Sequence, residues 1–138
     1  MKLKELMRVL VNNEKDAISI YEEEAELFAP LPKHGAEAAA LFARIAAEKR
    51  GRLEELGRIL KQSSGFRSRN TEPSRSVESA LRMHITDEMT AVANFVDLIK
   101  QMTNPEFKER MGQMLIETRT QLKALQAMQA GIRAELEK

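Results

Sequence analysis

Two glutamates occupy positions in the sequence where a carboxylate needs a chemical partner. Glu14 lies within the apolar stripe of the predicted helix 3–28, and Glu88 lies within that of the predicted helix 76–102. Burying an unpaired carboxylate in apolar surroundings is strongly unfavourable. Each glutamate therefore binds a metal ion, pairs with a cation or carries a proton, unless its side chain reaches solvent.

Two of the cations on the predicted helix 35–61 lie where its apolar stripe runs. The stretch RIAAEKRGRLEELGRIL, residues 44–60, places Lys49 and Arg52 on or beside the face that carries its apolar residues. In one interpretation, both side chains run along the apolar surface and leave their charges in water. We favour the other, in which they pair with the two glutamates inside the protein, because arginine binds a carboxylate through two hydrogen bonds. The predicted core polar cluster, in which the threonine and the glutamine donate hydrogen bonds, contains Glu14, Lys49, Arg52, Glu88, Thr118 and Gln121.

The remaining acid–base residues are expected in ordinary surroundings. His84 lies one turn before Glu88 and is expected at the surface or at the edge of the core. His34 falls in a turn and is expected in solvent, and the acidic run Glu22–Glu24 predicts a solvated helix face. The sequence contains no nucleophile–base arrangement that predicts hydrolysis.

The composition indicates an all-helical protein with one domain over residues 1–138. Good helix formers dominate the chain, which has 43% hydrophobic but only 4% aromatic residues, with 4 prolines and 6 glycines. Runs rich in valine, threonine and aromatic residues, which are typical of strands, are missing. The length suits a single hydrophobic core.

Charge and cysteine content exclude several classes of function. The 22 basic and 21 acidic residues give a net charge of +1, which argues against binding to nucleic acid or to an anionic membrane. No apolar run approaches the roughly 20 residues that a membrane span needs. The lack of cysteine excludes disulfides, thiolate metal sites and a thiol nucleophile. We therefore expect a soluble, cytoplasmic protein.

Apolar periodicity predicts four helices, and the lengths of the connections predict their topology. The helices cover about residues 3–28, 35–61, 76–102 and 104–135. The first and last connections are short, so each joins an antiparallel hairpin. The middle connection, residues 62–75, is long enough to return along a helix of roughly 35–50 Å. The prediction is a four-helix bundle of two antiparallel helical hairpins joined by a long crossover.

A weak internal repeat also predicts two related hairpins. Aligning Glu14 with Glu88 sets EKDAISIY against EMTAVANF, and the apolar positions coincide. Aligning Glu48 with Glu117 does the same for EKRGRLEEL and ETRTQLKAL. The matching stripes indicate a duplicated hairpin with approximate twofold symmetry.

The motif Glu-x-x-Ala-x-x-x-aromatic occurs at residues 14–21 and again at 88–95, and residues 41–46 read LFARIA. Over nearly the whole chain this arrangement resembles the rubrerythrin branch of the ferritin-like superfamily. The resemblance implies a ferritin-like four-helix bundle. In that family the first and third helices each give one Glu and the second and fourth each give a Glu-x-x-His, and together they hold two iron or manganese ions for oxidase or peroxidase chemistry. Glu14 and Glu88 match the two single-Glu positions.

Other residues take the remaining positions of the family's ligand set. Lys49 and Arg52 replace the Glu-x-x-His of the second helix. Thr118 and Gln121 replace that of the fourth. If the alignment with the family is shifted by one residue, Glu48 and Glu117 take the glutamate positions. The residues three positions later are then Gly51 and Thr120, so both histidines are still missing. We therefore expect neither metal nor cofactor. If iron or manganese is retained, the candidate ligands are Glu14, Glu88, His84, Glu48 and Glu117.

Three functions compete at this point. We favour a non-enzymatic ferritin-like bundle with a structural or regulatory role, which has lost its di-iron site. The first alternative is a rubrerythrin-type di-iron or manganese oxidoreductase, or a metal-binding protein, with an altered site. The second is a helical module that binds a partner protein or an apolar ligand. We also expect a homodimer, because Met83, Met89 and Met102 extend the apolar surface of the third helix.

Overall fold

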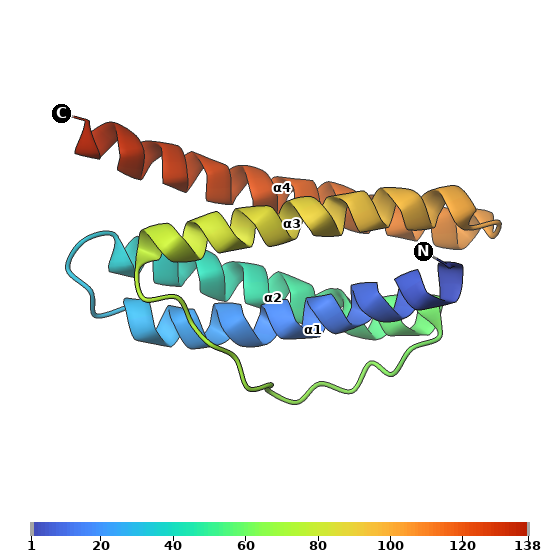
Figure 1. The fold of residues 1–138 in the computed structure, drawn as a ribbon. Coiled ribbons are helices and arrows are strands. Elements are labelled where there is room, and N and C mark those ends of the chain that lie inside the picture. The colour runs from blue at the N-terminus through green and yellow to red at the C-terminus, as the bar shows by residue number, and fades with distance from the viewer. Residues whose placement is uncertain (1, 138) are drawn as a thin grey trace.

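The computed structural model describes residues 2–137, so Met1 and Lys138 of the predicted domain lie outside the described residues. Within that range the chain forms helices and no strand, which confirms the all-helical prediction. The four helices are α1 (Leu3–Phe28), α2 (Gly35–Leu60), α3 (Val77–Gln101) and α4 (Pro105–Leu136) (Figure 1).

Local side-chain chemistry explains where α3 and α4 begin. The hydroxyl of Ser76 accepts a hydrogen bond from the Ser79 N–H at 3.1 Å, and the hydroxyl of Ser79 accepts one from the Ser76 N–H at 3.4 Å. The Asn104 side chain accepts from the N–H groups of Glu106 and Phe107 at 3.0 and 3.2 Å. These caps satisfy N–H groups that have no partner inside the helix.

The ends of α2 depend on backbone conformation. Lys61 adopts a left-handed conformation with φ of 56°, so α2 ends at Leu60, one residue earlier than predicted. At the other end, a Cβ on residue 35 would lie 2.2 Å from the carbonyl oxygen of Phe28, so the tight connection requires Gly35. His34, expected in solvent, is instead half-buried and lies 3.0 Å from Glu135.

The helices form two antiparallel hairpins, α1 with α2 and α3 with α4, as predicted. The hairpins pack with α1 against α3 and α2 against α4. In Figure 1, α1 and α4 run in one direction and α2 and α3 in the other, so neighbouring helices are antiparallel.

The connection between α2 and α3 crosses the bundle from end to end along α1 (Figure 1). Near its start, the Lys15 ammonium donates to the carbonyl oxygen of Ser63 at 2.7 Å. In its middle, the Arg69 N–H donates to the Ser19 hydroxyl at 3.0 Å. The predicted long crossover is confirmed, and its contacts bury part of α1 that would otherwise face solvent.

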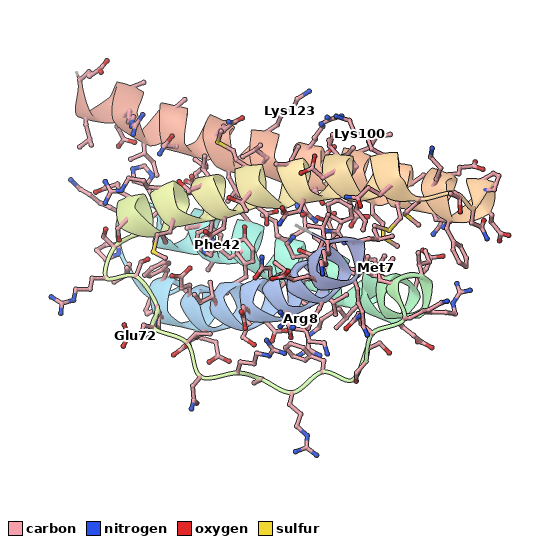
Figure 2. All side chains as sticks on the ribbon, turned by 45° about the vertical axis from the view of Figure 1, so that its right-hand side comes forward. Met7, Arg8, Phe42, Glu72, Lys100 and Lys123 are labelled. Carbon is pink, nitrogen blue, oxygen red and sulfur yellow. The ribbon has the colours of Figure 1, made fainter. Side chains whose placement is uncertain are left out.

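The core consists of two apolar clusters at different levels of the bundle. The Phe42 cluster contains Tyr21, Phe28, Ala38, Leu41, Phe42, Ile45, Ala46, Val77, Ala80, Leu81, Leu125 and Ile132. The Leu10 cluster contains Leu6, Leu10, Val11, Leu56, Ile59, Leu60, Phe95, Leu98, Met102, Met111 and Met114. Figure 2 shows Phe42 between the helices, whereas Lys100 and Lys123 point outward.

The methionines of α3 and the one directly after it divide between the surface and the core. Met102 is buried in the Leu10 cluster, so the prediction that it extends an outer apolar surface is wrong. It is the residue directly after the last turn of α3, where the backbone becomes extended, and its side chain packs in that cluster. Met83 and Met89 remain exposed at 49% and 55%. None of the helices in residues 2–137 combines the length and apolarity needed to cross a membrane.

Candidate functional site

A layer of buried polar side chains separates the two apolar clusters, and each helix contributes to it. In sequence, this layer lies between the segments of each helix that build the Phe42 cluster and those that build the Leu10 cluster. We call it the polar centre; its members are Glu14, Lys49, Arg52, Glu88, Thr118 and Gln121.

Lys49 lies between the two carboxylates. Its ammonium is 2.9 Å from Glu14 Oε2 and 3.2 Å from Glu88 Oε1. The side chain is 0% exposed, so the interpretation in which Lys49 reaches water is wrong for this residue. A single ammonium from α2 therefore joins a carboxylate of α1 to a carboxylate of α3.

Arg52 joins the same carboxylate to α4. Its Nε donates to Glu14 Oε1 at 3.2 Å, and its Nη2 pairs with the same oxygen. The guanidinium also donates to the Met114 carbonyl oxygen at 3.2 Å and to the Thr118 hydroxyl at 3.0 Å. With Lys49 and Arg52 both donating to it, Glu14 has a partner on each of its two oxygens.

Thr118 and Gln121 lie in the polar centre and both donate hydrogen bonds, as predicted, but their acceptors are not the carboxylates of α1 and α3. Thr118 accepts from Arg52 and donates to the Met114 carbonyl oxygen at 2.9 Å. Gln121 donates to Glu48 at 3.3 Å. The reason is the packing of α4 against α2, which brings these side chains to residues of α2.

The two buried glutamates differ in acidity. Burial alone would raise the pKa of the Glu14 carboxyl, but the Lys49 and Arg52 charges and hydrogen bonds outweigh it and lower the pKa to about 2. Burial raises the pKa of Glu88 above its usual value; Lys49 opposes this rise, and the nearby Glu14 charge adds to it. Glu14 is therefore the permanent anion, and Glu88 is the carboxyl that takes up a proton more readily.

His84 and Glu24 form a second buried pair, although we expected His84 at the surface or at the edge of the core and Glu24 on a solvated helix face. His84 Nε2 lies 2.5 Å from Glu24 Oε1, and the imidazole stacks on the Tyr21 ring at 3.9 Å. The other oxygen of Glu24 accepts from the Ser74 N–H at 2.8 Å. The expectation fails because the end of the crossover and α3 together cover this part of α1. The sequence does indicate that Glu24 is buried, because it follows Tyr21 by three residues and precedes Phe28 by four. Residues at these spacings lie on the same face of a helix.

The candidate metal ligands do not converge. Glu48 is exposed and accepts from Gln121, and Glu117 is 3.7 Å from Arg52. His84 pairs with Glu24 through Nε2, whereas the facing oxygens of Glu14 and Glu88 pair with Lys49. Within residues 2–137, no group of three histidine, aspartate or glutamate side chains has the geometry to hold a metal ion.

The donor chemistry of the polar centre also does not fit a di-metal site. Lysine and arginine have no lone pair to give a metal ion, and their charge repels one. Both occupy the oxygens of Glu14 that a metal ion would need.

Comparisons with protein-family models, with curated proteins and with solved structures give no match for this chain. Inference about its function therefore rests on the geometry of the side chains and on the sequence pattern.

Proposed function

We propose that this protein is a non-enzymatic, ferritin-like bundle, related to rubrerythrins, in which a salt-bridge centre has replaced the di-metal site and which has a structural or regulatory role. One observation carries the proposal: the Lys49 ammonium lies 2.9 and 3.2 Å from carboxylates of α1 and α3. The resemblance of the sequence to rubrerythrins implies that these two carboxylates would otherwise face metal ions.

Charge balance supports the proposal. The carboxylates of Glu14 and Glu88 carry two negative charges when both are ionised, and Lys49 and Arg52 carry two positive charges. A divalent ion entering this space would have to displace a buried ammonium from its hydrogen bonds, and the displaced cation has no other carboxylate in the polar centre. The arrangement thus favours two side-chain cations over metal.

The polar centre suits a structural role. It ties α2 to α1 and α3 through Lys49, and to α4 through Arg52. A shift of one helix along another would leave these charges unpaired in the core, which is costly. We propose that the polar centre thereby selects one register of the four helices, whereas the apolar clusters on either side supply most of the free energy of folding.

Metal loading tests the proposal. The purified protein is incubated with iron(II) and manganese(II) without oxygen, desalted, and subjected to elemental analysis. We expect well below one ion per chain. The matched control is Lys49→Glu with Arg52→His, which restores Glu-x-x-His on α2 and should gain metal. Two tightly held ions per native chain would overturn the proposal and support the oxidoreductase alternative.

We also propose that the protein forms a homodimer through α3. Met83 and Met89 expose about half of their side chains on this helix, at 49% and 55%. Burying such flexible apolar side chains against a second copy is favourable.

A further inference from the structure

A pocket of about 200 Å³ lies between α1 and α3, beside the polar centre. For comparison, an engineered apolar cavity of roughly 150 Å³ binds benzene. The walls of the pocket between α1 and α3 combine apolar side chains, such as Ala17, Ile20 and Ala91, with acidic ones. None of its lining residues is a lysine or an arginine.

Two buried polar atoms of the pocket's lining residues have no hydrogen-bond partner among residues 2–137. These are the hydroxyl of Tyr21, a residue that is 0% exposed, and Oε2 of Glu88, a residue that is 2% exposed. Buried polar groups in proteins are almost always satisfied, so two such orphans among the residues of one pocket need a physical explanation. Glu88 therefore has one oxygen held by Lys49 and one oxygen free.

The unbalanced charge of the pocket is negative. Of its carboxylates, Glu14 is paired with Lys49 and Arg52, and Asp16 lies 2.8 Å from Arg69. Glu88 is itself paired with Lys49 through its other oxygen. Among residues 2–137, Asp87 is therefore the carboxylate of the pocket that has no cation within salt-bridge distance. A ligand for this pocket must supply positive charge and donate hydrogen bonds.

We propose that the pocket binds a small organic ammonium ion. Its N–H groups donate to the free oxygen of Glu88 and to the hydroxyl of Tyr21, and its alkyl chain packs against Ala17, Ile20 and Ala91. A bare metal ion fits less well, because calcium needs six to eight oxygen ligands and the pocket's walls are partly apolar. The inference does not depend on the proposed structural role, and the metal-loading experiment tests that role separately.

Tyr21 makes the test direct. The protein has 1 tyrosine and no tryptophan, so its intrinsic fluorescence reports on the pocket. The probes are n-butylammonium, its neutral counterpart 1-butanol and its anionic counterpart butyrate, at pH 7 and constant ionic strength in potassium salts. We expect saturable binding of n-butylammonium, at least about tenfold tighter than that of 1-butanol because a charged hydrogen bond is gained. Butyrate should not bind.

Amide chemical shifts provide a second readout. If n-butylammonium changes neither the Tyr21 emission nor the amide shifts of Ala17 and Ala91 saturably, the proposal is overturned. Equal or tighter binding of 1-butanol or butyrate overturns it as well, because the pocket would then not select a cation.

Three variants locate the binding. Ala91→Leu fills the pocket and should abolish the response, and Asp87→Asn removes an exposed charge at its wall and should weaken binding severalfold. Asp97→Asn removes an exposed carboxylate of the same helix outside the pocket and should leave the affinity unchanged. An unchanged affinity in Ala91→Leu would contradict this location.

Discussion

Lys49 is the residue whose charge holds the polar centre together. Lys49→Ala leaves Glu14 with Arg52 alone and removes the cation from Glu88, so buried negative charge becomes unpaired. We predict a loss of about 3 kcal/mol in the free energy of unfolding, measured by urea denaturation.

The exposed Lys123 provides the control, since Lys123→Ala should change the free energy of unfolding by less than about 0.5 kcal/mol. Combining Lys49→Met with Glu88→Gln removes one charge of each sign and should recover most of the loss. A Lys49→Ala protein as stable as the native one would show that the ammonium contributes nothing to folding.

Glu14 and Glu88 should give opposite dependences of stability on pH. The pKa of Glu14 is lowered from 4.5 to about 2, so its stabilising contribution is present above pH 4.5 and is lost as the pH falls toward 2. That loss is about 3 kcal/mol. The pKa of Glu88 is raised, so its contribution is present below pH 4.5 and is lost as the pH rises through the raised value.

Differences between native protein and single variants isolate these contributions. The free energy of unfolding of native protein minus that of Glu14→Gln should decrease as the pH falls below 4.5. The same difference for Glu88→Gln should decrease as the pH rises above 4.5. Parallel curves for the two variants would contradict the assignment of acidities.

Tyr21 should resist ionisation. Burial raises the pKa of its hydroxyl well above the usual 10.0, and the Glu88 and Glu14 charges raise it further. We predict that the ultraviolet absorbance of tyrosinate stays absent as the pH rises past 10 and then appears together with the loss of helical circular dichroism. Stability should fall above pH 10, because the unfolded chain releases this proton first. Tyrosinate formation in the folded protein would contradict the prediction.

At the scale of elements, Glu24 fastens the end of the crossover to both α1 and α3. Glu24→Ala leaves the Ser74 N–H and the His84 imidazole without their partner. We predict a loss of about 2 kcal/mol and faster cleavage of the crossover by trypsin after the exposed Arg67 and Arg75.

Glu26, one half-turn further along α1, is exposed and serves as the control for this change. Glu26→Ala should leave both stability and the rate of cleavage unchanged. Equal cleavage rates in Glu24→Ala and native protein would mean that other contacts hold the crossover in place.

At the scale of the whole molecule, the proposed dimer has a direct measurement. Light scattering at tens of micromolar should give twice the 15.7 kDa mass of the chain. Met83→Glu with Met89→Glu places charges on the proposed α3 interface and should return the mass to one chain. Ile116→Glu, on the exposed face of α4, should not change it. A native mass of one chain would contradict the proposed homodimer.

The sequence by itself determined the helices, their topology and the need for charge pairing. Apolar periodicity and the caps at Ser76 and Asn104 are local properties of the sequence, so they determine closely where α3 and α4 begin. The length of residues 62–75 determined that the connection crosses the bundle. A glutamate within an apolar stripe requires a partner wherever the helix packs, so the sequence alone identifies Glu14 and Glu88 as carboxylates that need one.

Tertiary structure alone decided which partners these and other polar residues meet. The burial of Glu24 and His84 depends on a crossover that lies along α1, and the partners of Thr118 and Gln121 depend on α4 packing against α2. The pocket between α1 and α3 likewise exists only where two helices distant in sequence leave space. Periodicity within one helix indicates which face is buried, but the identity of the residue opposite is a property of the packed bundle.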